Sequence, residues 1–216
     1  DDQTKMAKLA ALGENNDMDN IIALGKRELE KQLEDERDKE YKSKLGAYVE
    51  NFLRIFLQNK MQQLNNAGNV KIDNTQGGQD LIISINGHPI FYIEVKSMWR
   101  KSDAIYMTMA QFKKSVINMA NYALFVFDMV DIPHGIIDSE CYDPIEENMT
   151  RRVSVFTDIG NINKGLFDCI NNINRCPTSI DLSGAKVRIP IDMLKQQLSL
   201  DEFCEDISHR ILLLIN

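Results

Sequence analysis

Two apolar segments joined through an Asn-Gly pair constrain the fold of this chain more than any other feature. Residues 81–85 read Leu-Ile-Ile-Ser-Ile, and residues 90–93 read Ile-Phe-Tyr-Ile. Asn86-Gly87 lies between them, and this dipeptide is the strongest short-range signal for a tight β-hairpin. The sequence therefore predicts two antiparallel strands whose pairing is set close to this turn.

Charged residues stand at the open end of the predicted hairpin. Asp80 precedes the first strand, and Glu94 and Lys96 follow the apolar part of the second. Because side chains alternate faces along a strand, Glu94 and Lys96 project from the same face. Two carboxylates on neighbouring strands can bind a hard divalent cation, and the cation together with a nearby ammonium can stabilise the negative charge of a phosphodiester. The alternative is a surface salt bridge on an edge strand, which stabilises a fold little.

The strand register decides between these readings. A plain two-residue turn at Asn86-Gly87 would pair Asp80 with Ile93 and put Glu94 on the opposite face, because a shift of one residue reverses every side chain. A shared cation requires Asp80 opposite Glu94. We therefore predict either an odd-numbered connection, such as Asn86-Gly87-His88 with a left-handed glycine, or a bulge within one strand.

Asp80 followed by Glu94-Val95-Lys96 resembles the signature of the PD-(D/E)XK nuclease superfamily, which has the restriction-endonuclease-like fold. Gln79 stands where that signature has proline. The order of a helix with Glu50, three strands, a helix with Gln111 and a strand at 122–127 is similar to the superfamily core. Residues 44–50 and the spacing to Tyr122 look most like the NO VEIN-type C-terminal domains. The resemblance covers residues 44–128 and implies an α/β fold with a mixed central sheet flanked by helices.

The resemblance implies a hydrolase, a DNA endonuclease that depends on Mg²⁺, with Mn²⁺ as a substitute. Asp80, Glu94 and the carbonyl of Val95 would hold the metal, and Lys96 would orient water or stabilise charge on phosphorus. Gln111 either closes a capping box with Thr108 or positions water and phosphate. Glu50 lies at the border of an apolar helix stripe, where it is either catalytic or simply exposed. That stripe consists of Leu45, Tyr48, Val49, Phe52 and Phe56.

Local charge matters more for DNA contact than the net charge of −7. Residues 96–114 carry five cations against one carboxylate, Asp103. Besides Lys96 these cations are Arg100, Lys101, Lys113 and Lys114, which we expect to contact DNA. A solvated helix face is the alternative reading.

The charge pattern also indicates how the chain is organised. Residues 34–40 contain no apolar side chain, and favourable i,i+4 pairs such as Asp38/Lys42 and Glu40/Lys44 recur there. We expect residues 1–43 to form a helical extension and residues 44–216 the nuclease-like domain. A short coiled coil around Leu24, Leu29 and Leu33 is the alternative for the extension.

The partners and setting of the chain follow from the resemblance and from composition. We expect DNA and an upstream module of the same polypeptide, an ATPase or helicase, as in bacterial antiviral defence proteins; a homodimer is left open. No apolar run approaches the roughly 18 residues of a bilayer span, so no membrane partner is expected. Four cysteines without a Cys-x-x-Cys pair favour a reduced cytoplasmic setting.

Two other functions remain open at this point. The first is a catalytically inactive nuclease-like domain that serves as a DNA-binding or assembly module. The second is an interaction domain that docks through the N-terminal helix. Beyond residue 131 the sequence predicts a long loop at 132–150, strands at 151–156 and 186–190, a helix at 161–173, and a last helix capped by Ser199.

Overall fold

The computed structural model divides the chain into two compact units, Asp1–Leu45 and Gly46–Asn216. This division lies close to the boundary expected at residues 43 and 44. The first unit contains the start of helix α2 (Asp17–Met61), on which the predicted pairs Lys42–Asp38 and Lys44–Glu40 are both formed. The structure describes residues 4–5, 17–62, 69–75, 79–100, 104–132, 148–173, 182, 184–194 and 197–215.

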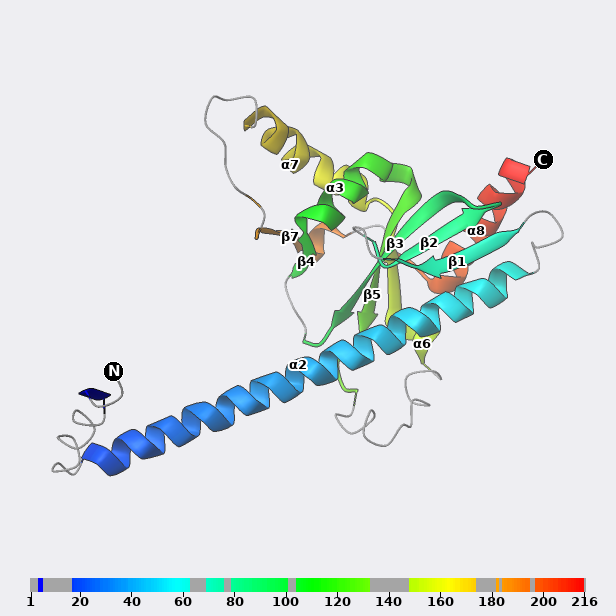
Figure 1. Cartoon of the computed structure of the whole chain (residues 1–216). Helices are drawn as coiled ribbons and strands as arrows, with labels where there is room; N and C mark the ends of the chain where they lie inside the picture. Colours follow the sequence, from blue (N-terminus) through cyan, green and yellow to red (C-terminus); the bar gives the residue numbers. More distant parts are fainter. Residues whose placement is uncertain are drawn as a thin grey trace. The chain divides into compact units, whose positions relative to one another are not determined.

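The second unit is an α/β structure around a mixed six-stranded sheet (Figure 1). The strand order is β1-β2-β3-β5-β6-β8, in which β3 and β5 are parallel and all other neighbours are antiparallel. These strands are β1 (Val70–Asn74), β2 (Leu81–Ile85), β3 (His88–Met98), β5 (Tyr122–Asp128), β6 (Val153–Phe156) and β8 (Gln197–Leu198). A separate two-stranded sheet pairs β4 (Ala104–Thr108) with β7 (Lys186–Pro190).

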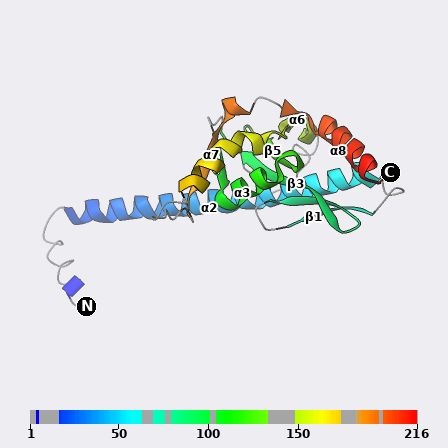
Figure 2. The ribbon, with the colours of Figure 1, turned by 90° about the horizontal axis from the view of Figure 1, so that it is seen from above.

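Strand β5 is buried on both of its faces because helices cover both faces of the sheet. Tyr122 and Leu124 pack in one core with Phe112 of α3 (Met109–Asn118) and Ile159 of α7 (Ile159–Ile173). Figure 2 shows α3 and α7 lying side by side. The remaining helical segments are α6 (Met149–Arg152), α8 (Leu200–Ile215), η2 (Met119–Asn121) and η3 (Ile191–Met193).

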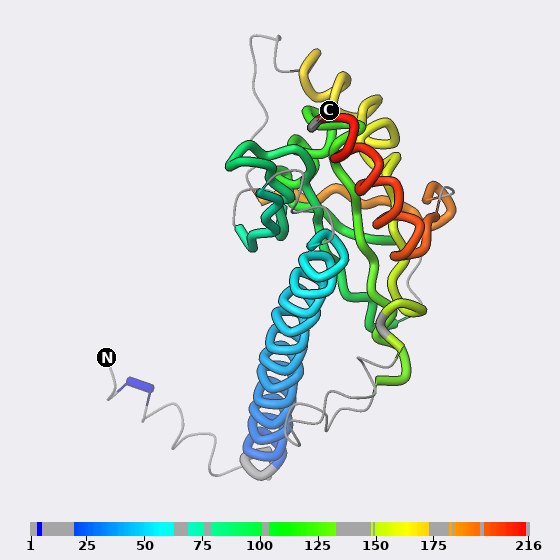
Figure 3. The backbone as a smooth tube through the Cα atoms, turned by 90° about the vertical axis from the view of Figure 1, so that its right-hand side faces the viewer, coloured from blue at the N-terminus to red at the C-terminus, as the bar shows by residue number. Residues whose placement is uncertain are grey.

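The opposite face of the sheet is covered by aromatic contacts from α8. The ring centroid of Phe203 lies 5.5 Å from that of Phe91 and 4.9 Å from that of Phe125, both in edge-to-face arrangements. Ser199 caps α8, since its hydroxyl accepts the N–H of Glu202 at 3.2 Å, as the sequence predicts. Figure 3 follows the chain from the hairpin β2–β3 to this last helix, drawn in red.

The buried face of α2 differs from the predicted apolar stripe. Within the second unit the fully buried positions are Val49, Leu53, Leu57 and Met61, spaced four residues apart, whereas Phe52 and Phe56 are only half-buried. Gln58 explains part of this orientation. Its side chain accepts the N–H of Ile72 at 2.9 Å and donates to the carbonyl of Val70 at 3.2 Å, which fixes the helix against the edge strand β1.

Three further elements depart from the sequence prediction. Residues 151–152 are helical, because the N–H groups of Arg151 and Arg152 both donate to the carbonyl of Asn148 and close a turn before β6. The helix α7 begins two residues earlier than predicted, and β4 is a strand that the sequence did not predict. Most of the predicted loop at 132–150 lies outside the described residues. None of the described helices is long and apolar enough to cross a lipid bilayer.

Candidate active site

The hairpin β2–β3 contains one extra residue, and this residue sets the register of the site. The turn itself is the two-residue Asn86-Gly87, with φ angles of 51° and 81° that suit a type I′ hairpin. Next to the turn Ser84 pairs with Pro89, but Ile83 pairs with Phe91, so Ile90 has no partner. The predicted bulge within one strand is thereby confirmed, and the three-residue turn is not used.

The bulge brings the two carboxylates to the same face. Beyond it Leu81 pairs with Ile93, and the next residues in this register, Asp80 and Glu94, lie opposite each other. The Asp80 N–H donates to the carbonyl of Ile93 at 2.9 Å, and Asp80 Oδ2 accepts the N–H of Val95 at 2.7 Å. The N–H and C=O of a strand residue point to the same side. The Val95 carbonyl therefore points to the side of β3 on which Asp80 lies, beyond the last β2–β3 pair.

Glu94 is completely buried and forms the centre of the site. Its Oε1 atom accepts the Lys96 ammonium at 2.7 Å and also the side-chain amide of Gln111. Its Oε2 atom has no hydrogen-bond donor in the described structure, which is costly for a buried carboxylate oxygen. One oxygen is thus fully engaged, and the other has no donor among the described residues. A hydrogen bond between the Glu94 and Asp80 side chains contributes to the raised pKa of Glu94.

Gln111 closes the predicted capping box and also contacts Glu94 and Lys96. At the start of α3 its Oε1 accepts the Thr108 N–H at 2.8 Å, and the Thr108 hydroxyl accepts the Gln111 N–H at 3.3 Å, which forms a capping box. The same Oε1 accepts the Lys96 ammonium at 3.3 Å. Because the Thr108 N–H can pair only with the amide oxygen, it turns the Gln111 amide nitrogen toward Glu94.

The electrostatics of the two carboxyl groups follow from this burial. Burial raises the pKa of Glu94 to about 8; the Lys96 charge opposes this shift, and the proximity of Asp80 adds to it. Burial also raises the pKa of Asp80, against the Val95 N–H and Lys96. Two ionised carboxylates cannot donate to each other, so their close approach favours either a shared proton or a cation between them.

Glu50 reaches the same site from α2. Burial and the charge of Asp80 raise its pKa, whereas a hydrogen bond from Asn74 and the charge of Lys96 lower it. This half-buried position agrees with the boundary placement predicted from the sequence. Glu50 therefore lies within electrostatic reach of the carboxylate pair rather than on the solvated face of the helix.

Tyr122 is a neighbour of the site that sequence reasoning missed. It is fully buried, and it pairs with Tyr92 in the parallel register of β3 and β5. Burial and the charges of Glu94 and Asp80 raise its pKa. The parallel pairing of β3 with β5 brings Tyr122 next to the site. This pairing cannot be predicted from the sequence of either strand.

The four predicted DNA-contacting cations are placed differently from one another. Arg100 and Lys113 are exposed, and Lys101 lies outside the described residues. Lys114 is half-buried, with its ammonium 4.3 Å from the centroid of the Tyr92 ring. The ammonium lies over the face of the Tyr92 ring, whose negative charge attracts a cation, so Lys114 is less available to phosphate than the exposed Lys113.

A divalent cation fits the donors at this site. Among the described residues no group of three or more His, Cys, Asp and Glu side chains is arranged to hold a metal ion, so any cation would rely on two carboxylates. Asp80 and Glu94 Oε2 would supply them, and the Val95 carbonyl would be a third oxygen. Mg²⁺ commonly retains several waters and needs only one or two carboxylates. The unpartnered Glu94 Oε2 is the observation that supports this fit.

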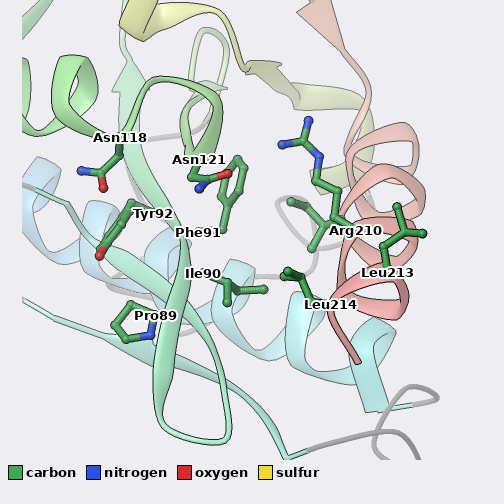
Figure 4. Close-up of a pocket in the computed structure, with 10 residues that line it drawn as sticks. Pro89, Ile90, Phe91, Tyr92, Asn118, Asn121, Arg210, Leu213 and Leu214 are labelled. Carbon is green, nitrogen blue, oxygen red and sulfur yellow. The ribbon is translucent and has the colours of Figure 1, made fainter. Parts of the chain in front are cut away.

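A cavity of about 500 Å³ lies at the other end of β3 (Figure 4). Ile90, the bulge residue, and Phe91 face Leu214 and Arg210 of α8 across it. The Arg210 guanidinium is already paired with Asp206 at 2.9 Å and with the carbonyl of Ala120 at 2.8 Å. The lining contains no carboxylate, so this cavity contributes nothing to a cation site.

Comparison of the chain with protein-family models, curated proteins and solved structures gives no match.

Proposed function

We propose that this chain is a metal-dependent nuclease domain that hydrolyses phosphodiester bonds in DNA. The observation that carries the proposal is the strand bulge at Ile90, which puts Asp80 opposite Glu94, where one buried Glu94 oxygen accepts no hydrogen bond in the described structure. A salt bridge serving stability alone would not require a fully buried carboxylate with a raised pKa. The restriction-endonuclease-like fold is part of the same proposal, and the mixed sheet flanked by helices agrees with it.

The side chains divide the work as follows. Asp80, Glu94 and the Val95 carbonyl would hold a metal ion beside the scissile phosphate. When bound, Mg²⁺ or Mn²⁺ supplies a water of lowered pKa and positive charge against the phosphate oxygens. Lys96, held 2.7 Å from Glu94 Oε1, orients the attacking water and offsets negative charge on phosphorus.

Two residues keep this arrangement in place. Gln111 holds Glu94 Oε1 and Lys96 through a single amide, so the carboxylate cannot rotate away from the metal. The charges of Asp80 and Lys96 act on the Glu50 carboxyl, and its raised pKa suits it to hold a proton beside the carboxylate pair. Both are therefore positioned for catalysis without being essential ligands.

The biological setting is proposed on the resemblance alone. The domain would act as the effector part of a larger cytoplasmic protein in antiviral defence, restriction or DNA processing. An upstream ATPase or helicase module would deliver the DNA to it.

Plasmid cleavage tests the proposal. The wild-type chain should nick or linearise plasmid DNA with Mg²⁺ or Mn²⁺, and EDTA should abolish cleavage. Asp80→Ala and Glu94→Ala should reduce cleavage to the EDTA level while far-UV circular dichroism remains that of the wild type. Cleavage that survives Glu94→Ala at the wild-type rate would refute the assignment. Binding of DNA by a wild-type chain that never cleaves it would favour the inactive nuclease-like module.

A further inference from the structure

The two-stranded sheet of β4 and β7 presents one face to solvent. From Ile105 onward burial alternates along β4, and it alternates from Lys186 to Ile189 of β7: Ile105, Met107, Val187 and Ile189 are buried, whereas Tyr106, Thr108, Lys186 and Arg188 are exposed. Tyr106 pairs directly with Arg188, and Thr108 with Lys186. Opposite residues in an antiparallel pair share a face. The exposed face, here called the β4–β7 platform, therefore consists of Tyr106, Thr108, Lys186 and Arg188.

The composition of the platform favours an anionic, aromatic ligand. Tyr106 is 51% exposed, a large exposure for an aromatic side chain on a paired strand. Two cations stand beside it on β7, and neither strand contains an acidic residue. An exposed ring among cations is the arrangement with which proteins hold nucleic acid bases by stacking and phosphates by charge.

The platform is joined directly to the candidate active site. Thr108 ends β4 and caps α3, and its backbone N–H holds the Gln111 amide that contacts Glu94 and Lys96. Lys186 lies opposite Thr108 at this end of the strand pair. A ligand that lies along the platform and extends past Lys186 would therefore reach the capping box beside the carboxylates.

We propose that the β4–β7 platform binds an unpaired stretch of the nucleic acid substrate, with Tyr106 stacked on a base and Lys186 and Arg188 on phosphates. The identity of the ligand rests on the proposed nuclease function. A paired duplex conceals its base faces, so stacking on a single ring selects single-stranded segments or frayed ends. The platform would then decide which strand reaches the site.

Fluorescence anisotropy in EDTA tests this proposal without cleavage. The probes are a short fluorescein-labelled oligothymidylate and a duplex of the same length. The wild-type chain should bind the single strand more tightly than the duplex. Tyr106→Ala should weaken binding of oligothymidylate by about fivefold or more, and Tyr106→Phe should restore it. Replacing both Lys186 and Arg188 by Ala should reduce the slope of log affinity against log salt by about 1.4, or about 0.7 per phosphate contact.

Matched controls separate this surface from general charge effects. Lys71→Ala removes an exposed strand lysine at the far edge of the six-stranded sheet and should leave the salt slope unchanged. Circular dichroism of each variant excludes unfolding. No binding of oligothymidylate by the wild type, or wild-type affinity in Tyr106→Ala, would overturn the proposal.

The same variants distinguish failure of this proposal from failure of the proposed function. If cleavage requires Asp80 and Glu94 while Tyr106→Ala binds oligothymidylate with wild-type affinity, the proposed role of the platform is wrong and the nuclease assignment stands. If Tyr106 and the β7 cations govern binding but no metal supports cleavage, the platform stands and the nuclease assignment fails.

Discussion

Two buried polar clusters contact helix α3, and they differ in whether all of their polar groups form hydrogen bonds. The site cluster, Asp80, Glu94, Lys96 and Gln111, lies at the start of the helix. The helix-contact cluster, Ser115 and Asn163, lies where α7 crosses it. In the second cluster the Asn163 amide donates to the Ser115 hydroxyl at 2.9 Å, which in turn donates to the carbonyl of Phe112 at 2.8 Å.

The helix-contact cluster consists of neutral groups whose hydrogen bonds are made. It accompanies a close approach of the two helices, because a Cβ atom on Gly160 would lie 2.6 Å from the Ser115 carbonyl oxygen and 2.7 Å from Met119 Cα. The site cluster contains charges, raised pKa values and one buried oxygen without a donor. Such an unsatisfied group reduces stability. We therefore assign the helix-contact cluster to helix packing and the site cluster to ligand binding.

Loss of Lys96 should have the largest effect on activity. Lys96→Ala should reduce plasmid cleavage to the EDTA level while Mn²⁺ binding is largely kept, because the ammonium acts on water and phosphate rather than on the metal. Lys96→Arg should not restore cleavage, since the guanidinium is bulkier and planar. As the matched control, Asn163→Ala should cleave at the wild-type rate below its melting temperature. Wild-type cleavage by Lys96→Ala would remove Lys96 from the mechanism.

Gln111→Leu should reduce cleavage by roughly 10- to 100-fold, as loss of a residue that orients a metal ligand does. The substitution keeps the volume of the side chain but removes both the bond to Glu94 and the capping bond to Thr108. Thr108→Ala separates these effects, because it removes the capping hydroxyl and leaves the amide in place. Equal cleavage by Gln111→Leu and wild type would assign Gln111 to helix capping alone.

Gly160→Ala should destabilise the fold by about 1–3 kcal/mol, because the new methyl group meets backbone atoms that cannot move aside locally. Urea unfolding measures this change as a lower midpoint with an unchanged m-value. Cleavage measured well below the midpoint should match the wild type. A loss of cleavage without a loss of stability would show that the contact between α3 and α7 influences the site, and it would contradict the separate roles of the two clusters.

The stability of the metal-free chain should fall as the pH rises. A native pKa of about 8 for Glu94, against 4.5 for the free group, means that the native state keeps a proton that the unfolded state has released between these values. The free energy of unfolding therefore decreases across this interval by up to about 1.4 kcal/mol per pH unit. The raised pKa values of Asp80 and Glu50 act in the same direction.

Urea unfolding at several pH values in EDTA checks this dependence. Glu94→Gln should flatten the decline, because the amide does not titrate, whereas Asn163→Ala should keep the slope while lowering stability throughout. Stability that rises between pH 5 and pH 8 in the wild type would contradict a protonated, buried Glu94.

The smallest expected effect concerns duplex DNA. Lys113→Ala should lower the slope of log affinity against log salt by about 0.9, as loss of one phosphate contact does. Lys114→Ala should change the slope less, because the Lys114 ammonium already lies over the Tyr92 ring. Anisotropy titrations at several salt concentrations measure both slopes. If neither slope changes, duplex DNA binds elsewhere on the chain.

The local features of the site were predictable, but the long-range ones were not. The Asn86-Gly87 turn and the Thr108–Gln111 capping box follow from neighbouring residues. The bulge was predicted, as one of two alternatives, only from the requirement that Asp80 and Glu94 share a face of the sheet. The pairing of β4 with β7 joins residues about 80 positions apart, and nothing in Ala104–Thr108 identifies its partner. The buried face of α2 was predicted only in part: Val49 is buried as predicted, but Phe52 and Phe56 are half-buried, and the contacts of Gln58 with β1 explain part of this orientation.

Complete burial of Glu94 could not be read from the sequence either. Burial depends on the three elements that surround β3, namely α3, β2 and the parallel neighbour β5. Sequence spacing places Glu94 and Lys96 on one face of a strand, but it does not determine which helix covers that face. The raised pKa of Glu94 is therefore a property of the tertiary structure.

Binding of Mn²⁺ followed by electron paramagnetic resonance tests most directly whether the site cluster awaits a cation. The signal of free aqueous Mn²⁺ should decrease when the wild-type chain is added, and the decrease should be as large with Asn163→Ala. It should be lost with Glu94→Gln, which retains the shape of the side chain but removes the carboxylate. Equal Mn²⁺ binding by wild type and Glu94→Gln, or no binding by the wild type, would contradict the account.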